Sequence, residues 1–166
     1  MILYHGTTYN NFKKIYSDKE IIVTNDENSP YKDAGSYKTT EGYVYLSSYP
    51  LDSLEFASKS WLTANGDGCN LLVILKIELD EAELENDEDE ERINSSSFKE
   101  AKQYRIKRNI NYLTDVKDLA FFGFKNFQDS CDFFENKRKI VWISKERKWN
   151  GNFHAMGDKI LEQYEL

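Results

Sequence analysis

The chain's most hydrophobic stretch, Leu-Leu-Val-Ile-Leu at residues 71–75, limits the possible folds more than any other segment. Five consecutive aliphatic residues bounded by turn-forming residues are typical of a strand that is covered on both faces. The run then fades through Lys76-Ile77-Glu78-Leu79 into a strongly acidic segment. We therefore expect residues 71–75 to form the central strand of a sheet.

Shorter strand and helix patterns are spread along the chain without a regular alternation of the two. Strand patterns occupy residues 2–4, 21–24, 42–47, 103–107 and 139–143. Helix patterns occupy residues 8–16, 50–61 and 159–164, whereas residues 115–127 mix helix and turn signals and residues 25–40 form a polar loop. This irregular order favours an α+β fold over a doubly wound sheet, and we expect one domain spanning residues 1–166.

The acidity of the chain is confined to one segment. Of its 29 acidic residues, ten lie within residues 78–91, which hold no basic residue, and the other 19 face 22 lysines and arginines. Ten like charges so close together repel one another, so we expect a solvated loop or sheet edge that is partly mobile and has no catalytic role. The rest of the chain has a slight positive excess, which leaves room for an anionic ligand.

Composition narrows the class of protein. Hydrophobic residues make up 40% of the chain and aromatic residues 14%, as in a folded domain. No apolar run is long enough to span a membrane and no signal peptide is recognisable, so we expect a cytoplasmic monomer without a membrane partner. Cys69 and Cys131 lack a metal-binding or disulfide spacing, and with only two histidines beside them we expect no metal site.

One of the two histidines lies in the hexapeptide Leu-Tyr-His-Gly-Thr-Thr at residues 3–8. Gly6 permits a close backbone approach or a positive φ, and Thr7 or Thr8 can cap a following helix. His5 is thus expected at the end of a strand, where the next turn leaves room for a ligand. A surface turn that happens to carry an imidazole explains the same hexapeptide.

The segment Gly-Tyr-Val-Tyr-Leu-Ser at residues 42–47 has the alternation of a strand. Val44 and Leu46 share one face, while Tyr43, Tyr45 and Ser47 share the other. The first face can enter the core while the tyrosines line a wetter surface. Three residues later, a proline fits the first turn of the next helix.

The chain resembles the ADP-ribosyltransferase superfamily in the order and spacing of three segments. These are His-Gly-Thr at residues 5–7, Val-Tyr-Leu-Ser at residues 44–47 and the helix over residues 54–61. The branch is the one with His, Tyr and Glu signature residues, which includes diphtheria-toxin-like and poly-ADP-ribose-polymerase-like enzymes. The hydrophobic strand that runs into an acidic turn is similar to small bacterial and phage relatives, some of them toxin-like effectors. The resemblance covers about two thirds of the chain and implies a mixed, split β-sheet with short helices.

The resemblance also implies a function. The chain would be a mono-ADP-ribosyltransferase that consumes NAD as a substrate and modifies a protein or a nucleic acid. A histidine can bond a ribose hydroxyl, a glycine backbone can bind the nicotinamide amide, and a tyrosine ring can stack on the nicotinamide. The residues implied to contact NAD are His5, Gly6, Thr7, Tyr43, Tyr45 and Ser47.

The third signature position departs from the family's pattern. In the family a glutamate starts a late strand, and here Gln103 occupies that place. Glu100, three residues earlier, could reach the site from the preceding loop. A carboxylate stabilises the oxocarbenium-like ribose better than an amide does. The implied catalytic set is therefore His5 and Tyr45 with Gln103 or Glu100, while Gln103 could equally be an ordinary solvent-facing strand residue.

Other functions remain open at this point. Water as the acceptor would make the chain an NAD glycohydrolase. An RNA 2′-phosphotransferase has a similar tyrosine-strand sequence, but that family requires basic side chains in its site and fits Tyr45 less well. A non-catalytic module that binds NAD, ADP-ribose or a protein partner is favoured by the glutamine at position 103. Basic clusters within residues 92–108 and 137–149 can hold phosphates or lie on solvated faces.

Overall fold

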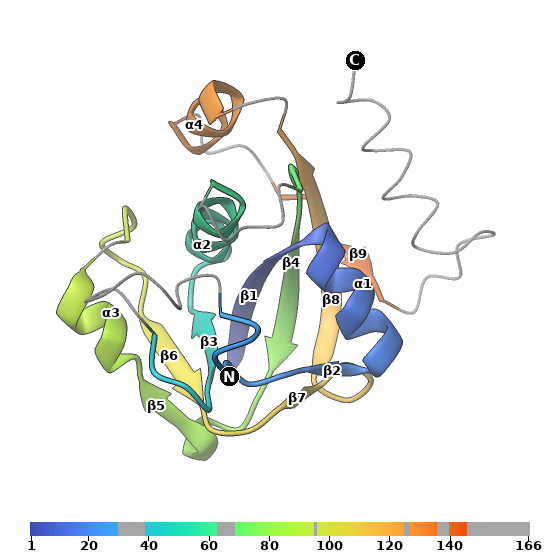
Figure 1. Ribbon diagram of the computed structural model, residues 1–166, viewed down its shortest axis with the longest axis vertical. Helices are drawn as coiled ribbons and strands as arrows, with labels where there is room; N and C mark the ends of the chain where they lie inside the picture. The colour runs from blue at the N-terminus through green and yellow to red at the C-terminus, as the bar shows by residue number, and fades with distance from the viewer. Residues whose placement is uncertain (30–38, 63–68, 95, 125–126, 136–139, 146–166) are drawn as a thin grey trace.

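The computed structural model describes residues 1–29, 39–62, 69–94, 96–124, 127–135 and 140–145. Its main element is a seven-stranded sheet in the order β5-β6-β3-β1-β4-β8-β9, with all neighbouring pairs antiparallel (Figure 1). These strands are β1 (Ile2–Thr8), β3 (Val44–Ser47), β4 (Leu71–Glu78), β5 (Leu84–Asn86), β6 (Gln103–Ile106), β8 (Val116–Gly123) and β9 (Ile143–Ser144). A second sheet pairs β2 (Glu20–Ile21) with β7 (Ile110–Asn111).

The helices are short, and the expected α+β class is confirmed. The expected mixed sheet is not found among the described residues, because all of its neighbouring strands pair in the antiparallel direction. The helices are α1 (Tyr9–Asp18), α2 (Pro50–Leu62), α3 (Glu88–Ile93) and α4 (Phe127–Glu135), with one 3₁₀ helix, η2 (Glu81–Glu83). The two residues predicted to mark the start of a helix are confirmed in that role. The Thr8 hydroxyl accepts a hydrogen bond from the Asn11 amide at the start of α1, and Pro50 is the first residue of α2.

The predicted central strand is confirmed as well. β4 lies between β1 and β8, and the side chains of residues 71–75 are completely buried. Val73 belongs to a core cluster with Tyr9 of α1, whereas Ile74 belongs to a second cluster with Leu54 of α2. The sheet is therefore covered on both faces. Burial of each such side chain contributes about 1.5–3 kcal/mol to folding.

The sheet is split between β1 and β3. β1 pairs with β4 along all seven of its residues, but it pairs with β3 only where Tyr4 lies opposite Ser47. That single pair joins the three-stranded part β5-β6-β3 to the four-stranded part β1-β4-β8-β9. Beyond it, residues of β1 and β3 face each other without a regular ladder.

Some predicted segments differ from the structure. Of the strand predicted over residues 21–24, only Ile21 belongs to a strand, β2. Residues 115–127, where helix and turn signals are mixed, contain β8, which pairs with β4 from the Leu71–Gly123 pair to the Ile77–Val116 pair. Pairing with a distant strand thus outweighs the local helix signals. Within residues 139–143, only Ile143 contributes to a strand among the described residues. The predicted helix over residues 159–164 lies outside the described residues.

The acidic segment is mostly exposed and includes β5 at the edge of the sheet, which agrees with the solvated edge that its charge predicts, but it is not a loop. Residues 78–91 contain the end of β4, η2, β5 and the start of α3, and Asp87, Asp89 and Glu90 are buried. These carboxylates find hydrogen-bond donors: the Asp87 side chain caps α3 by accepting from the amides of the other two. The buried Arg105 side chain binds two further acidic residues of the segment. Local partners therefore overcome the repulsion among like charges.

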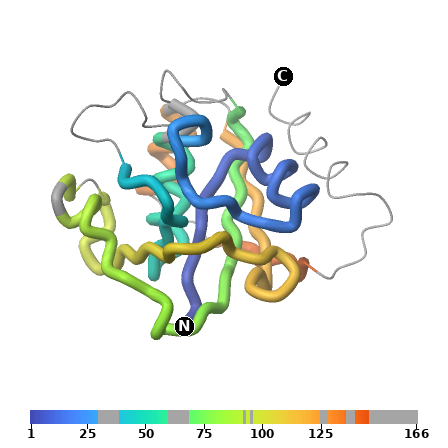
Figure 2. Tube along the Cα trace, turned by 60° about the horizontal axis from the view of Figure 1, so that its bottom comes forward, coloured from blue at the N-terminus to red at the C-terminus, as the bar shows by residue number. Residues whose placement is uncertain are grey.

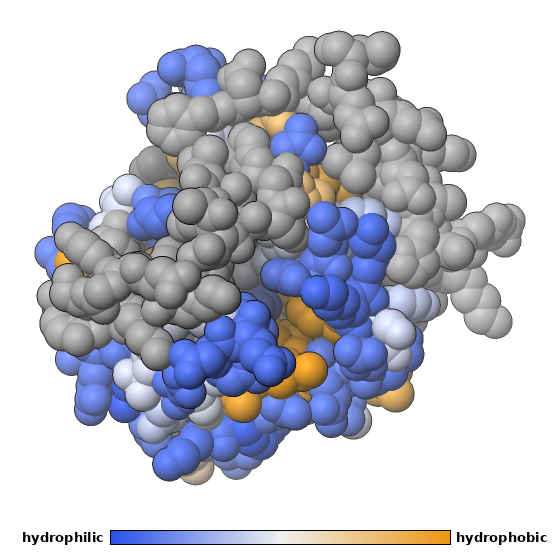
Figure 3. Space-filling model, viewed as in Figure 1, coloured by the Kyte–Doolittle hydropathy of each residue, from blue (hydrophilic) through white to orange (hydrophobic). Residues whose placement is uncertain are grey.

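Before β8, the chain passes the end of the sheet at which β1 begins. Figure 2 shows the segment between β6 and β8 crossing that end, where β7 pairs with β2. On the face seen in Figure 3, the coloured surface is mostly hydrophilic, with apolar atoms in small patches. None of the helices in the described part of the chain has the length and apolar character needed to cross a bilayer.

Candidate functional site

The side chain of His5 and the backbone of Tyr45 are brought together where the sheet splits. The His5 Nδ1 atom lies 3.0 Å from the backbone carbonyl oxygen of Tyr45. A carbonyl oxygen only accepts, so Nδ1 carries the proton in this hydrogen bond. Burial lowers the pKa of His5, although its bond to Tyr45 opposes the shift. A neutral imidazole protonated at Nδ1 leaves Nε2 as a hydrogen-bond acceptor.

The two side chains leave the sheet on opposite faces. Because Tyr4 lies opposite Ser47, these residues share a face, and alternation places Tyr45 on that face too. His5, adjacent to Tyr4, starts from the other face. The imidazole therefore contacts the backbone of Tyr45 rather than its phenol ring.

The Tyr45 hydroxyl is bound within the protein. It lies 2.6 Å from the Asp89 Oδ2 atom and 2.7 Å from the backbone oxygen of Thr40. The carboxylate is the stronger acceptor, because hydrogen bonds to charged groups are stronger than neutral ones. Burial and the bond to Asp89 both raise the pKa of Tyr45, so its hydroxyl stays protonated. The centroid of the Tyr43 ring lies 6.5 Å from that of Tyr45 and 4.3 Å from the guanidinium carbon of Arg105.

Gly6 is required by the packing of α2 on β1. A Cβ atom at this position would lie 1.9 Å from the backbone oxygen of Ser53 and 3.2 Å from the Cβ atom of Ala57. Helix α2 thus approaches the strand closely beside the histidine. Thr7 is buried as well. Gly6 therefore lets the helix pack on the strand at the split, whatever a ligand contacts there.

Gln103 begins β6, as the sequence predicts, and lies opposite Ser47 of β3. Its Nε2 atom donates to the Asp52 Oδ2 atom over 2.7 Å. The hydroxyls of Ser96 and Ser47 also bond to the Asp52 carboxylate, and the Asp52 residue is completely buried. Burial raises the pKa of Asp52, while the three hydrogen bonds oppose the shift.

Asp52 is absent from the residues that the sequence singles out. It lies in the first turn of α2, where acidic residues are common because they interact favourably with the helix dipole. Nothing in the local pattern distinguishes a buried carboxylate from a surface one at this position. The partners that make it unusual, Gln103 and Ser96, come from distant parts of the chain.

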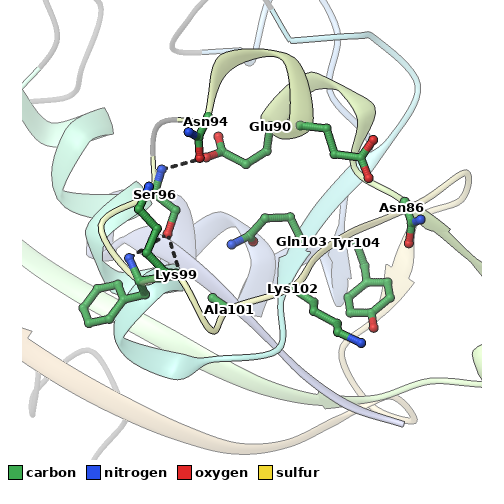
Figure 4. Close-up of a pocket in the computed structure, with 11 residues that line it drawn as sticks. Asn86, Glu90, Asn94, Ser96, Lys99, Ala101, Lys102, Gln103 and Tyr104 are labelled. Carbon is green, nitrogen blue, oxygen red and sulfur yellow. Dashed lines mark hydrogen bonds between the residues drawn. The ribbon is translucent and has the colours of Figure 1, made fainter.

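A cavity of about 420 Å³ adjoins Gln103 (Figure 4). It lies between α3, the segment that follows this helix, and strand β6. Its polar lining includes Glu90, Asn94, Ser96, Lys99, Lys102 and Gln103. Figure 4 shows Gln103 near the centre of the residues around the cavity. The size suits a small polar ligand or part of a larger one.

The two candidates for the third signature position differ in placement. Gln103 lines the cavity, whereas Glu100 is exposed and is not among the lining residues. Of the two, only Gln103 also pairs with the tyrosine strand. Among the described residues, no group of histidine, cysteine and acidic side chains could hold a metal ion.

Comparisons of the chain with protein-family models, with curated proteins and with solved structures found no match.

Proposed function

We propose that this chain is an NAD-dependent mono-ADP-ribosyltransferase that modifies a protein or a nucleic acid. One observation carries the proposal: the three signature positions lie on neighbouring strands around a split in the sheet. His5 is on β1, Tyr45 is on β3 and Gln103 begins β6. The hydrogen bond between His5 and Tyr45 spans the split, and Gln103 lies in register with Ser47 two residues after Tyr45.

The chemistry of the first two residues suits NAD. The Nε2 atom of His5 can accept a hydrogen bond from a ribose hydroxyl of the substrate. The half-buried Tyr45 ring can stack on the nicotinamide, while its hydroxyl is bound by Asp89. Tyr43 and Ser47 extend the same face of β3, and the backbone of Gly6 and Thr7 forms the opposite side of the split.

The reaction breaks the bond between the ribose C1 atom and the nicotinamide nitrogen. The electron pair leaves with nicotinamide, and the positively charged ribose then bonds to a nucleophile of the acceptor, which loses a proton. A hydrogen-bond acceptor near the ribose lowers the barrier by stabilising this positive charge. Gln103 is the residue proposed for that role, and Glu100 is the alternative.

Two labelled forms of NAD test this function. The full chain is incubated with NAD labelled in the nicotinamide or in the adenylate, with and without protein and nucleic-acid acceptors. A transferase releases labelled nicotinamide and transfers the adenylate label to a macromolecule. Release without transfer would indicate an NAD glycohydrolase. No release under any condition would contradict both enzymatic functions.

A second candidate function is a non-catalytic module that binds NAD or ADP-ribose. The amide at Gln103 favours it, because a neutral side chain stabilises a developing positive charge less well than a carboxylate does. Calorimetry separates this candidate from the first. A binder would take up NAD or ADP-ribose through His5 and Tyr45 without releasing nicotinamide.

A further inference from the structure

Asp52 is a charged residue held in the interior by neutral partners. It is completely buried, and its carboxylate is bonded by Gln103, Ser96 and Ser47. Gln103 belongs to β6, Ser96 to the segment that follows α3, and Ser47 to β3. The carboxylate therefore connects three parts of the fold. Burying a charge without a cation is costly unless hydrogen bonds compensate.

We propose that Asp52 is a positioning residue that fixes the amide of Gln103, and this inference rests on the proposed function. The Gln103 Nε2 atom is committed to the Asp52 Oδ2 atom over 2.7 Å. Because an amide is planar, this bond directs Oε1 away from Asp52 and leaves it as the acceptor of the side chain. Since Gln103 lines the cavity, the pair determines which group a ligand meets there.

The same contact explains why a glutamine suits position 103. A glutamate in this place would set two carboxylates within hydrogen-bond distance, and one of them would have to keep a proton. With glutamine, the negative charge stays on Asp52, one hydrogen bond behind the amide. A nearby buried charge polarises the amide, so Oε1 is a stronger acceptor than an isolated amide oxygen. The carboxylate of the site is thus retained at a different residue.

Four proteins test the pair: wild type, Asp52→Asn, Gln103→Glu and the double variant. At saturating NAD, each single substitution is expected to lower nicotinamide release at least tenfold with KM changed less than threefold. The double variant exchanges amide and carboxylate, so it is expected to return to within threefold of wild type. Gln103→Glu alone should add an ionisation near neutral pH to the rate profile, which the double variant lacks. Asp118→Asn, on β8, is the matched control for loss of an acidic group.

Two measurements need no turnover. In wild type, the side-chain amide signal of Gln103, identified by its absence in Gln103→Glu, should be protected from hydrogen exchange. The two substitutions should also be non-additive in the free energy of unfolding. A rapidly exchanging Gln103 amide, or additive effects in both rate and unfolding, would overturn the proposal. An inert wild type would overturn the proposed function alone, since the amide signal and the unfolding cycle still decide whether Asp52 positions Gln103.

Discussion

The imidazole of His5 is hydrogen-bonded to the backbone oxygen of Tyr45, with its Nδ1 atom 3.0 Å from that oxygen. His5 directly follows Tyr4, which forms the single ladder pair between β1 and β3 with Ser47. The hydrogen bond ties the two parts of the sheet together, and it also determines the tautomer of the ring. A single hydrogen bond therefore has both a structural and a chemical consequence.

Replacing His5 should weaken the binding of NAD. His5→Ala removes the Nε2 acceptor, so we expect a loss of about 1–3 kcal/mol in binding free energy, the cost of a lost hydrogen bond to a ligand. Calorimetry with NAD measures the change, and circular dichroism checks that the variant is folded. An affinity equal to that of wild type would exclude His5 from the site.

The Tyr45 hydroxyl should contribute to stability rather than to ligand binding. Tyr45→Phe keeps the ring and removes the hydrogen bond to Asp89, so we expect the free energy of unfolding to fall by about 1.5–3 kcal/mol. The affinity for NAD should change little, whereas Tyr45→Ala should weaken it by about 1–3 kcal/mol through loss of the ring. Tyr43→Phe is the matched control for loss of a phenol hydroxyl. Equal stability of Tyr45→Phe and wild type would contradict the role given to Asp89.

Substitutions at two glycines distinguish the cost of a steric clash from the cost of an unfavourable backbone conformation. Gly6→Ala would place a Cβ atom 1.9 Å from a backbone oxygen of α2, so we expect a loss of at least about 3 kcal/mol in stability. Gly42 has a φ of +86° and no atom near the added Cβ, so Gly42→Ala should cost only about 1–2 kcal/mol. Denaturant unfolding compares the two. A milder loss for Gly6→Ala than for Gly42→Ala would mean that α2 does not pack against β1 so closely.

Asp87 should make stability depend on pH. Burial, with repulsion from Asp89 and Glu90, raises the pKa of Asp87 from 3.8 to about 6. The folded chain then holds this proton more tightly than the unfolded chain. The stability that the protonated Asp87 contributes is therefore fully present below about pH 4 and is lost as the pH rises through 6. The shift in pKa corresponds to a loss of up to about 3 kcal/mol in the free energy of unfolding.

The substitution Asp87→Asn isolates this effect, since asparagine also caps helices well. Relative to wild type, the variant should gain stability between pH 4 and pH 7.5. Urea unfolding at both pH values measures the difference, in which the other titrating groups largely cancel. A difference that does not change with pH would show that Asp87 titrates normally.

Much of the sheet is predictable because its strands carry strong local patterns. Residues 71–75 are aliphatic throughout, and residues 44–47 alternate, so their roles as a central and a half-buried strand follow from sequence alone. The cap at Thr8 and the proline that begins α2 also act within a few residues. By contrast, β8 forms because a distant strand pairs with it, and no local signal carries that information.

The site is predictable only in part, for the same reason. The positions of Tyr45 and Gln103 on their strands follow from local pattern and from the family resemblance. The position expected for His5, at the end of a strand, is wrong: His5 lies in the middle of β1, because the pairing of β1 with β4 continues to Thr8. The contacts that define their chemistry join residues more than 40 positions apart, as in the bonds from Gln103 to Asp52 and from Tyr45 to Asp89. Charge counting likewise predicts repulsion in the acidic segment but not the donors that it meets in the fold.

Nicotinamide release from NAD by the full chain is the most direct test of the proposed function. Wild type and His5→Ala are compared at saturating NAD, with product separated by chromatography. The account predicts release by wild type above the uncatalysed rate, and a rate at least tenfold lower in His5→Ala, which corresponds to about 1.4 kcal/mol. Equal rates in the two proteins, or a wild type that releases no nicotinamide above the uncatalysed rate, would contradict it.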